Sequence, residues 1–227
     1  MDVLLVAGLW LRHSIWDDVA VELERHGHRP RPIALPGVDD GSTATTLADQ
    51  LDAVVAEIDR SERPMVVGHS AACTLAWMAA DRRPDQVSMV ALIGGFPATD
   101  GETYADFFET TDGAMAFPGW EPFAGADSAD LDEATRDEIA SGAVPVREGV
   151  SKGIVNLTDP RRFDVPTLVI CPEFTPDQAK RWIDGGDVPE LAAAKRLTLV
   201  DMDTGHWPMV TASSELARIL SDAAGGN

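Results

Sequence analysis

The sequence predicts an α/β protein in which a mostly parallel sheet of about six strands is flanked by helices. Two observations lead to this prediction. Over the first hundred residues, short apolar runs alternate with segments whose apolar residues have helical spacing. Two more apolar runs follow near residues 165 and 197. A chain of 227 residues can bury a substantial core and shows no linker, so we expect a single domain over residues 1–227.

The predicted elements follow this alternation along the chain. Gly27 marks the end of the first helix, and Pro36-Gly37 closes the second strand. Strands are expected at residues 3–7, 32–35, 65–67, 87–93, 165–171 and 197–200. Helices are expected at residues 15–23, 44–58, 71–80 and 214–221, and residues 223–227 are expected to be disordered.

The pattern changes between about residue 100 and residue 162. Gly and acidic residues divide this stretch into short helices, and we expect no strand in it. Its aromatic residues are Tyr104, Phe107, Phe108, Phe117, Trp120 and Phe123. Two interpretations of this stretch are compatible: a helical lid over one edge of the sheet, and a helical layer that completes the core. We therefore expect a lid insertion, at about 100–162, that also packs on the core.

The formal charge of −20, with 38 acidic and 18 basic residues, bears on possible partners. A surface of this kind repels nucleic acid and anionic membranes, so we expect neither as a partner. Cys73 and Cys171 lie in apolar runs, which indicates buried thiols and not a disulfide framework. The sequence shows neither a signal peptide nor an apolar run of transmembrane length, and we predict a cytoplasmic protein.

The stretch Gly68-His69-Ser70-Ala71-Ala72 joins a predicted strand directly to a predicted helix. A strand that turns this sharply into a helix exposes its central residue on a strained corner, as in a nucleophile elbow. The small neighbours suit such a corner, and an ordinary strand–helix junction with an incidental serine is the alternative. Ser70 is therefore the candidate nucleophile.

A serine nucleophile needs an adjacent base, and His206 is the best candidate among the five histidines. It follows the last predicted strand, at the edge of the sheet that also carries Ser70. His13 follows the first strand and could line the pocket mouth. His69, inside the corner, is expected to be structural, with its ring directed away from Ser70.

An oxyanion needs two preorganised donors, and two backbone N–H groups are candidates. Ala71 N–H follows the serine, and Leu9 N–H lies in the loop after the first strand. Gly8 permits the backbone turn that this loop needs, although it could equally be a plain strand terminator. Trp10 and Trp207, in the two loops that face Ser70, are the remaining candidates for substrate binding.

These motifs resemble the α/β-hydrolase superfamily, and within it the branch of plant methyl esterases and hydroxynitrile lyases with their bacterial relatives. The resemblance rests on Gly8-Leu9-Trp10, Trp16, Leu35-Pro36-Gly37, Gly68-His69-Ser70, Phe96-Pro97, Asp100-Gly101-Glu102 and the run from Thr204 to Met209. It covers nearly the whole chain, loosely in the lid. It implies the α/β-hydrolase fold with a helical lid and a cofactor-free serine hydrolase, without a metal.

The chain departs from the family pattern in three places. Ala7 replaces a histidine before the oxyanion loop, and Ala72 replaces the second glycine of the elbow. The acid that orients the histidine is also displaced, since its usual position aligns with Phe174 or Thr175. Glu173 is the nearest carboxylate, and Asp177, which more plausibly caps the following helix, is the alternative. The other site used by the family, after the preceding strand, holds Gly94.

The sequence thus predicts a carboxylesterase-like serine hydrolase that cleaves a small, fairly apolar ester through an acyl-enzyme. Ser70, His206 and Glu173 are its predicted catalytic residues. A catalytically weak or inactive ligand-binding protein on the same fold is the alternative, because the acid is displaced. A hydroxynitrile lyase is less favoured, since the family's lyases carry a lysine where this chain has Trp207. A small-molecule ester is the expected partner, and a monomer and a homodimer remain equally open.

Overall fold

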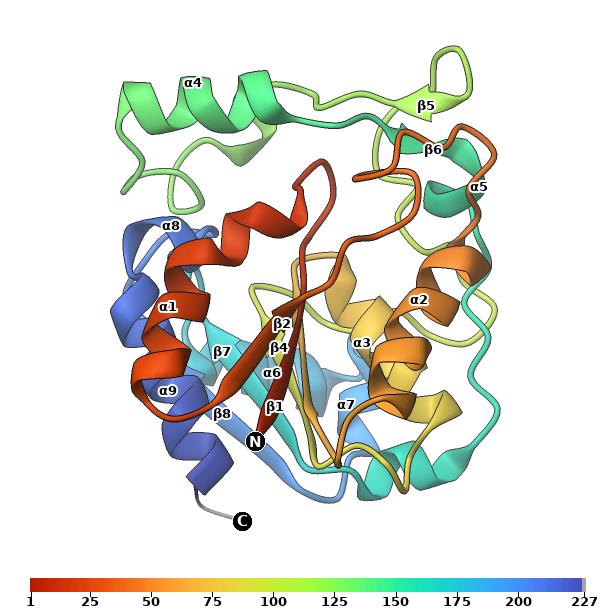
Figure 1. The fold of residues 1–227 in the computed structure, drawn as a ribbon, viewed down its shortest axis with the longest axis vertical. Coiled ribbons are helices and arrows are strands. Elements are labelled where there is room, and N and C mark those ends of the chain that lie inside the picture. Colours follow the sequence, from red (N-terminus) through yellow and green to blue (C-terminus); the bar gives the residue numbers. More distant parts are fainter. Residues whose placement is uncertain (226–227) are drawn as a thin grey trace.

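A six-stranded sheet forms the centre of the computed structural model, which describes residues 1–225 (Figure 1). All neighbouring strands are parallel, as predicted. In spatial order the strands are β2 (Arg29–Pro32), β1 (Asp2–Val6), β3 (Met65–His69), β4 (Met89–Ile93), β7 (Thr167–Cys171) and β8 (Leu197–Asp201). The strands β1, β3, β4 and β7 are buried along their whole length, which explains why they are continuous apolar runs.

Helices cover both faces of the sheet and form two hydrophobic cores. On one face lie η1 (His13–Trp16), α1 (Asp17–Arg25), α8 (Pro208–Thr211) and α9 (Ser213–Gly225). On the other lie α2 (Leu47–Asp59), α3 (Ala72–Arg82), α6 (Pro176–Gly185) and α7 (Pro189–Ala192). Helix α3 is buried from Ala72 to Asp81 because it lies between the sheet and neighbouring elements. This layer arrangement confirms the predicted fold class.

Several predicted boundaries differ from the observed ones, and three of these differences have a clear structural basis. The second strand ends at Pro32, whereas residues 32–35 were expected, because its pairing with β1 begins three residues earlier. As an edge strand it tolerates two prolines, whose missing N–H groups cost no ladder bond. Helix α2 begins after residue 46, later than expected, because Thr46 and Asp49 form a capping box. Residues 223–225 belong to α9 and are not disordered, and residues 226–227 lie outside the described residues.

The chain between β4 and η3 crosses the carboxyl ends of the strands, at the top of Figure 1. We call residues 100–164 the cap segment. It contains β5 (Ala114–Met115), η2 (Glu121–Phe123), α4 (Glu133–Gly142), β6 (Val146–Arg147), α5 (Glu148–Ser151) and η3 (Pro160–Asp164). The expectation that it holds no strand is wrong, because β5 and β6 form a two-residue antiparallel pair.

A buried ion network anchors the end of the cap segment to the core. Arg162 donates to both carboxylate oxygens of Glu190, at 2.9 and 3.2 Å, and to Asp81 at 3.2 Å. Trp77 Nε1 donates to the same Glu190 at 2.9 Å. These contacts join the cap segment to α3 and α7.

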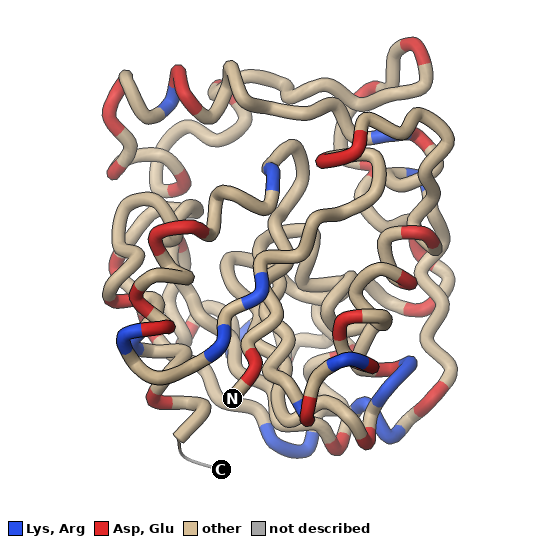
Figure 2. The backbone as a smooth tube through the Cα atoms, viewed as in Figure 1, with Lys and Arg blue, Asp and Glu red and all other residues tan. Residues whose placement is uncertain are grey.

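Acidic residues are distributed over the whole molecule, as Figure 2 shows. Many Lys and Arg residues lie toward the end where the strands begin, away from most of the cap segment. Within residues 1–225, none of the helices combines the length and the apolar character needed to cross a bilayer.

Candidate active site

Ser70 occupies the corner between β3 and α3, in the left-handed region with a φ of 55°. A non-glycine residue rarely adopts this conformation, and such strain concentrates at functional sites. The corner is held because Ser70 N–H donates to Ile93 O at 2.8 Å. It also requires small neighbours, since a Cβ at Gly68 would overlap the Ala72 carbonyl and one at Gly95 would lie 2.7 Å from Ser70 O.

His206 and Glu173 meet at the same edge of the sheet. The Nδ1 atom of His206, in the loop after β8, lies 2.8 Å from Oε1 of Glu173, in the loop after β7. Because a carboxylate only accepts, Nδ1 carries the proton, and Nε2 is left as an acceptor. The side chains are only 11% and 13% exposed. In the described part of the chain, the second oxygen of Glu173 has no hydrogen-bond partner.

The carboxylate of Glu173 approaches the histidine beside Gly94, the position where the family can place its acid. Gly94 has a φ of 59°, and a Cβ there would lie 3.1 Å from His206 Nδ1 and 3.3 Å from Glu173 Oε2. Asp177 lies in the first turn of α6, whose N-cap is Thr175. The expectation that Asp177 caps this helix is therefore wrong, because Thr175 forms a capping box with Gln178.

His69 connects the serine corner to the histidine loop. Its Nε2 donates to the backbone carbonyl of His206 at 2.7 Å, and the ring is buried. Burial lowers the pKa of His69 well below its usual range, and the neighbouring charge of His206 acts in the same direction. His69 is therefore a neutral support, as expected. However, it also lines a pocket together with Ser70, which the sequence did not indicate.

Two backbone N–H groups are available near Ser70. Among residues 1–225, neither Leu9 N–H nor Ala71 N–H donates a hydrogen bond to a protein group. Trp10, next to Leu9, has a φ of 64°. It is tied to the cap segment, since its Nε1 donates to Met115 O at 3.1 Å and its carbonyl accepts from Val144 N–H at 2.9 Å. The cap segment thus holds the loop that carries Leu9.

The pocket at Ser70 is small and largely aromatic. Its volume of about 20 Å³ is enough for about one water molecule. It is lined by Leu9, Trp10, Leu11, His69, Ser70, Phe117, Phe123, Ile139, Ala143, His206 and Trp207. Trp207 packs on Phe123 and Trp120 of the cap segment, at ring distances of 5.5 and 5.2 Å. In the described structure, no hydrogen bond joins Ser70 Oγ to His206, and such bonds often tighten only when substrate binds.

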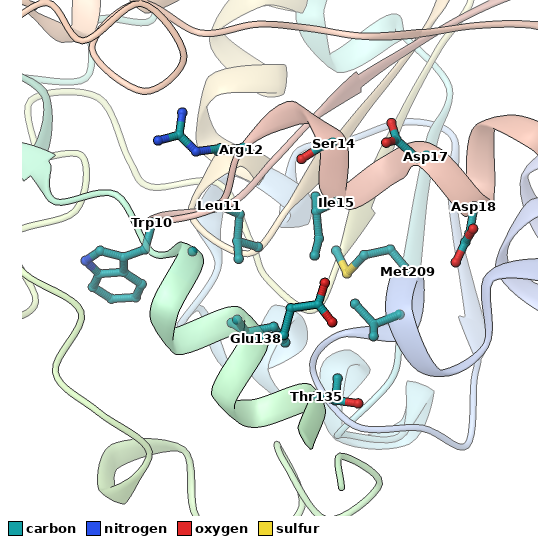
Figure 3. A pocket seen from close by; sticks show the side chains of 13 residues that line it. Trp10, Leu11, Arg12, Ser14, Ile15, Asp17, Asp18, Thr135, Glu138 and Met209 are labelled. Atoms are coloured by element: carbon teal, nitrogen blue, oxygen red, sulfur yellow. The ribbon is translucent and has the colours of Figure 1, made fainter. Parts of the chain in front are cut away.

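A second cavity of about 320 Å³ adjoins this pocket and is shown in Figure 3. Trp10, Leu11 and Ile139 line both spaces. Its other walls include Ile15 and Met209, and Glu138 of α4 points into the space between the cap segment and η1. His13 is not among the residues that line either space, and its Nδ1 lies 2.8 Å from Asp39 instead.

The cysteines provide no alternative nucleophile at this site. Both lie within the described residues, are free and are buried. Burial raises the pKa of Cys73, and it raises that of Cys171 to about 12, so both thiols stay protonated at neutral pH. Within residues 1–225, no group of three or more His, Cys, Asp or Glu side chains could hold a metal ion.

A parallel sheet with helices on both faces and a serine on a sharp β3–α3 corner defines a protein of the α/β-hydrolase type. The chain belongs to the alpha/beta hydrolase family, whose model matches residues 3–219. The resemblance inferred from the motifs is thereby confirmed.

Solved structures with low sequence identity share this fold. An extracellular α/β-hydrolase from a Paenibacillus species has a TM-score of 0.79 at 17% identity, covering 98% of each chain. A methylesterase from Arabidopsis has a TM-score of 0.77 at 14% identity, covering 99% of each chain. A pyrethroid hydrolase from Sphingobium faniae has a TM-score of 0.71 at 21% identity, covering 100% of this chain and 98% of the other.

Among curated proteins, the versican core protein of Homo sapiens is 27% identical over 212 residues. These are 83% of this chain but only 6% of that protein, so the chain spans a small fraction of its relative's length. This similarity defines no family for the chain. The Paenibacillus structure is described as extracellular, and the cytoplasmic location expected for this chain stays a prediction.

Proposed function

We propose that the protein is a serine hydrolase of the carboxylesterase type, with Ser70, His206 and Glu173 as its catalytic residues. One observation carries the proposal: the serine on the strained β3–α3 corner shares a pocket with a histidine that is hydrogen-bonded to a carboxylate. This is the constellation that activates a serine for nucleophilic attack.

In this mechanism Ser70 Oγ attacks the ester carbonyl carbon while His206 Nε2 takes the hydroxyl proton. The oxyanion accepts hydrogen bonds from Leu9 N–H and Ala71 N–H. His206 then protonates the leaving alkoxide, and an acyl-serine remains. A water molecule, deprotonated by His206, attacks this acyl group. The bond between the acyl carbon and Ser70 Oγ then breaks, His206 returns the proton to Ser70 Oγ, and the acid is released. Glu173 orients the imidazole and stabilises the imidazolium in both steps.

The contact between Glu173 and His206 favours a hydrolase over an inactive binding protein, because it supplies the acid that the sequence left uncertain. The residue after the histidine is Trp207, whereas the family's lyases carry a lysine at this position. Trp207 packs against the rings of Phe123 and His206. This arrangement favours ester hydrolysis over cyanohydrin cleavage.

The substrate is a small, fairly apolar ester, since Trp10, Phe117, Phe123 and Trp207 surround the serine. A pocket of about 20 Å³ cannot hold an ester, so the cap segment has to move when substrate binds, as a lid would. The adjoining cavity of about 320 Å³ is the natural place for the longer substituent.

A fluorophosphonate probe and a short-chain aryl ester test the proposal. The wild-type protein should be labelled at Ser70 alone and should hydrolyse the ester. Ser70→Ala should lose both activities, and Ser42→Ala, which changes a serine outside the pocket, should keep them. Labelling that persists in Ser70→Ala would remove the β3–α3 corner from the mechanism.

A further inference from the structure

The loop that carries His206 is bound by a carboxylate of the cap segment. Oδ2 of Asp130, which precedes α4, accepts from Gly205 N–H at 2.8 Å and from the Thr211 hydroxyl at 2.7 Å. These two donors lie on either side of His206 in the sequence. One oxygen of the cap segment therefore bridges both ends of the turn that holds the histidine.

The backbone of the histidine is bound by the same part of the cap segment. His206 N–H donates to the carbonyl of Asp127 at 2.7 Å. The fit is close, because a Cβ at position 205 would overlap the Asp130 carboxylate and the Asp127 carbonyl. Only glycine allows the two segments to approach this far.

His206 is thus held from both sides of the pocket. Glu173, in the loop after β7, binds its ring, and His69, the last residue of β3, binds its carbonyl. Residues 127–130 of the cap segment accept the hydrogen bonds from the N–H groups of His206 and Gly205 and from the Thr211 hydroxyl. Hydrogen bonds to an ionised carboxylate are the stronger kind, so Asp130 makes the principal contact.

We propose that Asp130 is a positioning residue for His206, which is in place for catalysis only when residues 127–130 of the cap segment are seated on its loop. The proposal rests on the proposed function, in which His206 is the general base. It couples substrate entry to the histidine, because Phe117 and Phe123 of the same cap segment line the small pocket at Ser70. Once the ester has entered, the return of residues 127–130 to the histidine loop completes the catalytic site.

The chain offers a matched control two residues away. The carboxylate of Asp132 accepts from Thr135 N–H at 2.8 Å and caps α4. Asp130→Ala and Asp132→Ala therefore remove the same charge and the same kind of bond from the same segment. Asp130→Ala alone removes a contact to the histidine loop. Asp130→Asn keeps an acceptor oxygen and serves as the rescue variant.

Steady-state hydrolysis of a short aryl ester supplies the first measurement. Asp130→Ala should lower kcat about tenfold with little change in KM, since small displacements of a catalytic group reduce the rate strongly. Asp132→Ala should keep the wild-type kcat, and Asp130→Asn should recover most of it. Asp130 and Glu173 also line a cavity of about 460 Å³. In Asp130→Ala, a water molecule from this cavity could take the place of the carboxylate. A wild-type kcat in this variant would overturn the proposal.

The downfield proton resonance of His206 Nδ1–H supplies a measurement that does not depend on turnover. This resonance reports the hydrogen bond to Glu173. It should be lost or broadened in Asp130→Ala and retained in Asp132→Ala and Asp130→Asn. A sharp resonance in Asp130→Ala would overturn the proposal even if the wild-type protein hydrolysed no ester. Absence of ester turnover and of fluorophosphonate labelling in the wild type would instead refute the proposed function.

Discussion

Glu173 Oε1 accepts a hydrogen bond from His206 Nδ1 at 2.8 Å, and the two residues are 33 positions apart in the sequence. They follow the adjacent strands β7 and β8, which pair along their whole length. The contact arises because the carboxyl ends of parallel strands bring their loops to one edge of the sheet. The longer side chain of glutamate reaches past Gly94, which leaves room for it.

The acid is tested by two amide substitutions. Glu173→Gln should lower kcat by up to about 10⁴-fold, because the imidazole loses the partner of its charged form. Asp177→Asn should keep wild-type turnover, since Asp177 lies in the first turn of α6. Both variants should unfold near the wild-type temperature. A dead Asp177→Asn with an active Glu173→Gln would move the acid to α6.

The general base is tested by two histidine substitutions. His206→Ala should cost several orders of magnitude in kcat, as loss of a residue that acts within a triad does. His13→Ala should stay active, because His13 contacts Asp39 outside the pocket and its side chain is 42% exposed. The kcat of each variant is measured with a short aryl ester. The opposite pattern would show that His13 is the base.

Stability below neutral pH should depend on His69. The unfolded chain binds a proton at this histidine below its ordinary pKa of about 6.5, whereas burial lowers the pKa of the folded form. The unfolded state therefore holds more protons there, and the free energy of unfolding decreases as the pH is lowered below neutral, by up to about 1.4 kcal/mol per pH unit. His69→Gln, which keeps a donor for the carbonyl of His206, should flatten this dependence in urea titrations at pH 7.5 and 5.5. If the free energy of unfolding changed equally between pH 7.5 and 5.5 in the wild type and in His69→Gln, the prediction would be contradicted.

The buried ion network at Arg162 is expected to contribute strongly to stability. Arg162→Ala leaves Asp81 and Glu190 buried without their partner, which should lower the free energy of unfolding by about 3–5 kcal/mol. Arg161→Ala is the control, because this neighbouring arginine makes only exposed ion pairs and its loss should change little. Equal urea midpoints for the two variants would show that the network does not stabilise the fold.

Ile139 lines both the pocket at Ser70 and the adjoining cavity of about 320 Å³, and its side chain should limit the length of the acyl group that the enzyme accepts. Ile139→Ala removes part of this side chain and should raise kcat/KM for an octanoate ester relative to an acetate ester. Ile154→Ala makes the same change in the cap segment at a side chain that is 59% exposed, and should leave the ratio unchanged. An unchanged ratio in Ile139→Ala would place the substituent elsewhere.

The sheet could be predicted from the sequence because its strands are buried on both faces. Continuous apolar runs such as β3 and β7 follow directly from that burial. The corner at Ser70 could also be predicted, since a strand that passes into a helix through a few small residues can do so with few backbone conformations. The short pair β5–β6 left no comparable signal, because two residues are too few for a periodic pattern.

The fold class and the serine corner follow from the amino-acid sequence alone, since both depend on the local order of apolar and small residues. The sequence offered two carboxylates for the acid, and only the tertiary structure brought Glu173 to His206. The support from His69 and the bridge from Asp130 to Gly205 were likewise invisible, because these partners are far apart in the sequence. Such contacts depend on how loops pack across the sheet edge, and this packing is a property of the whole chain.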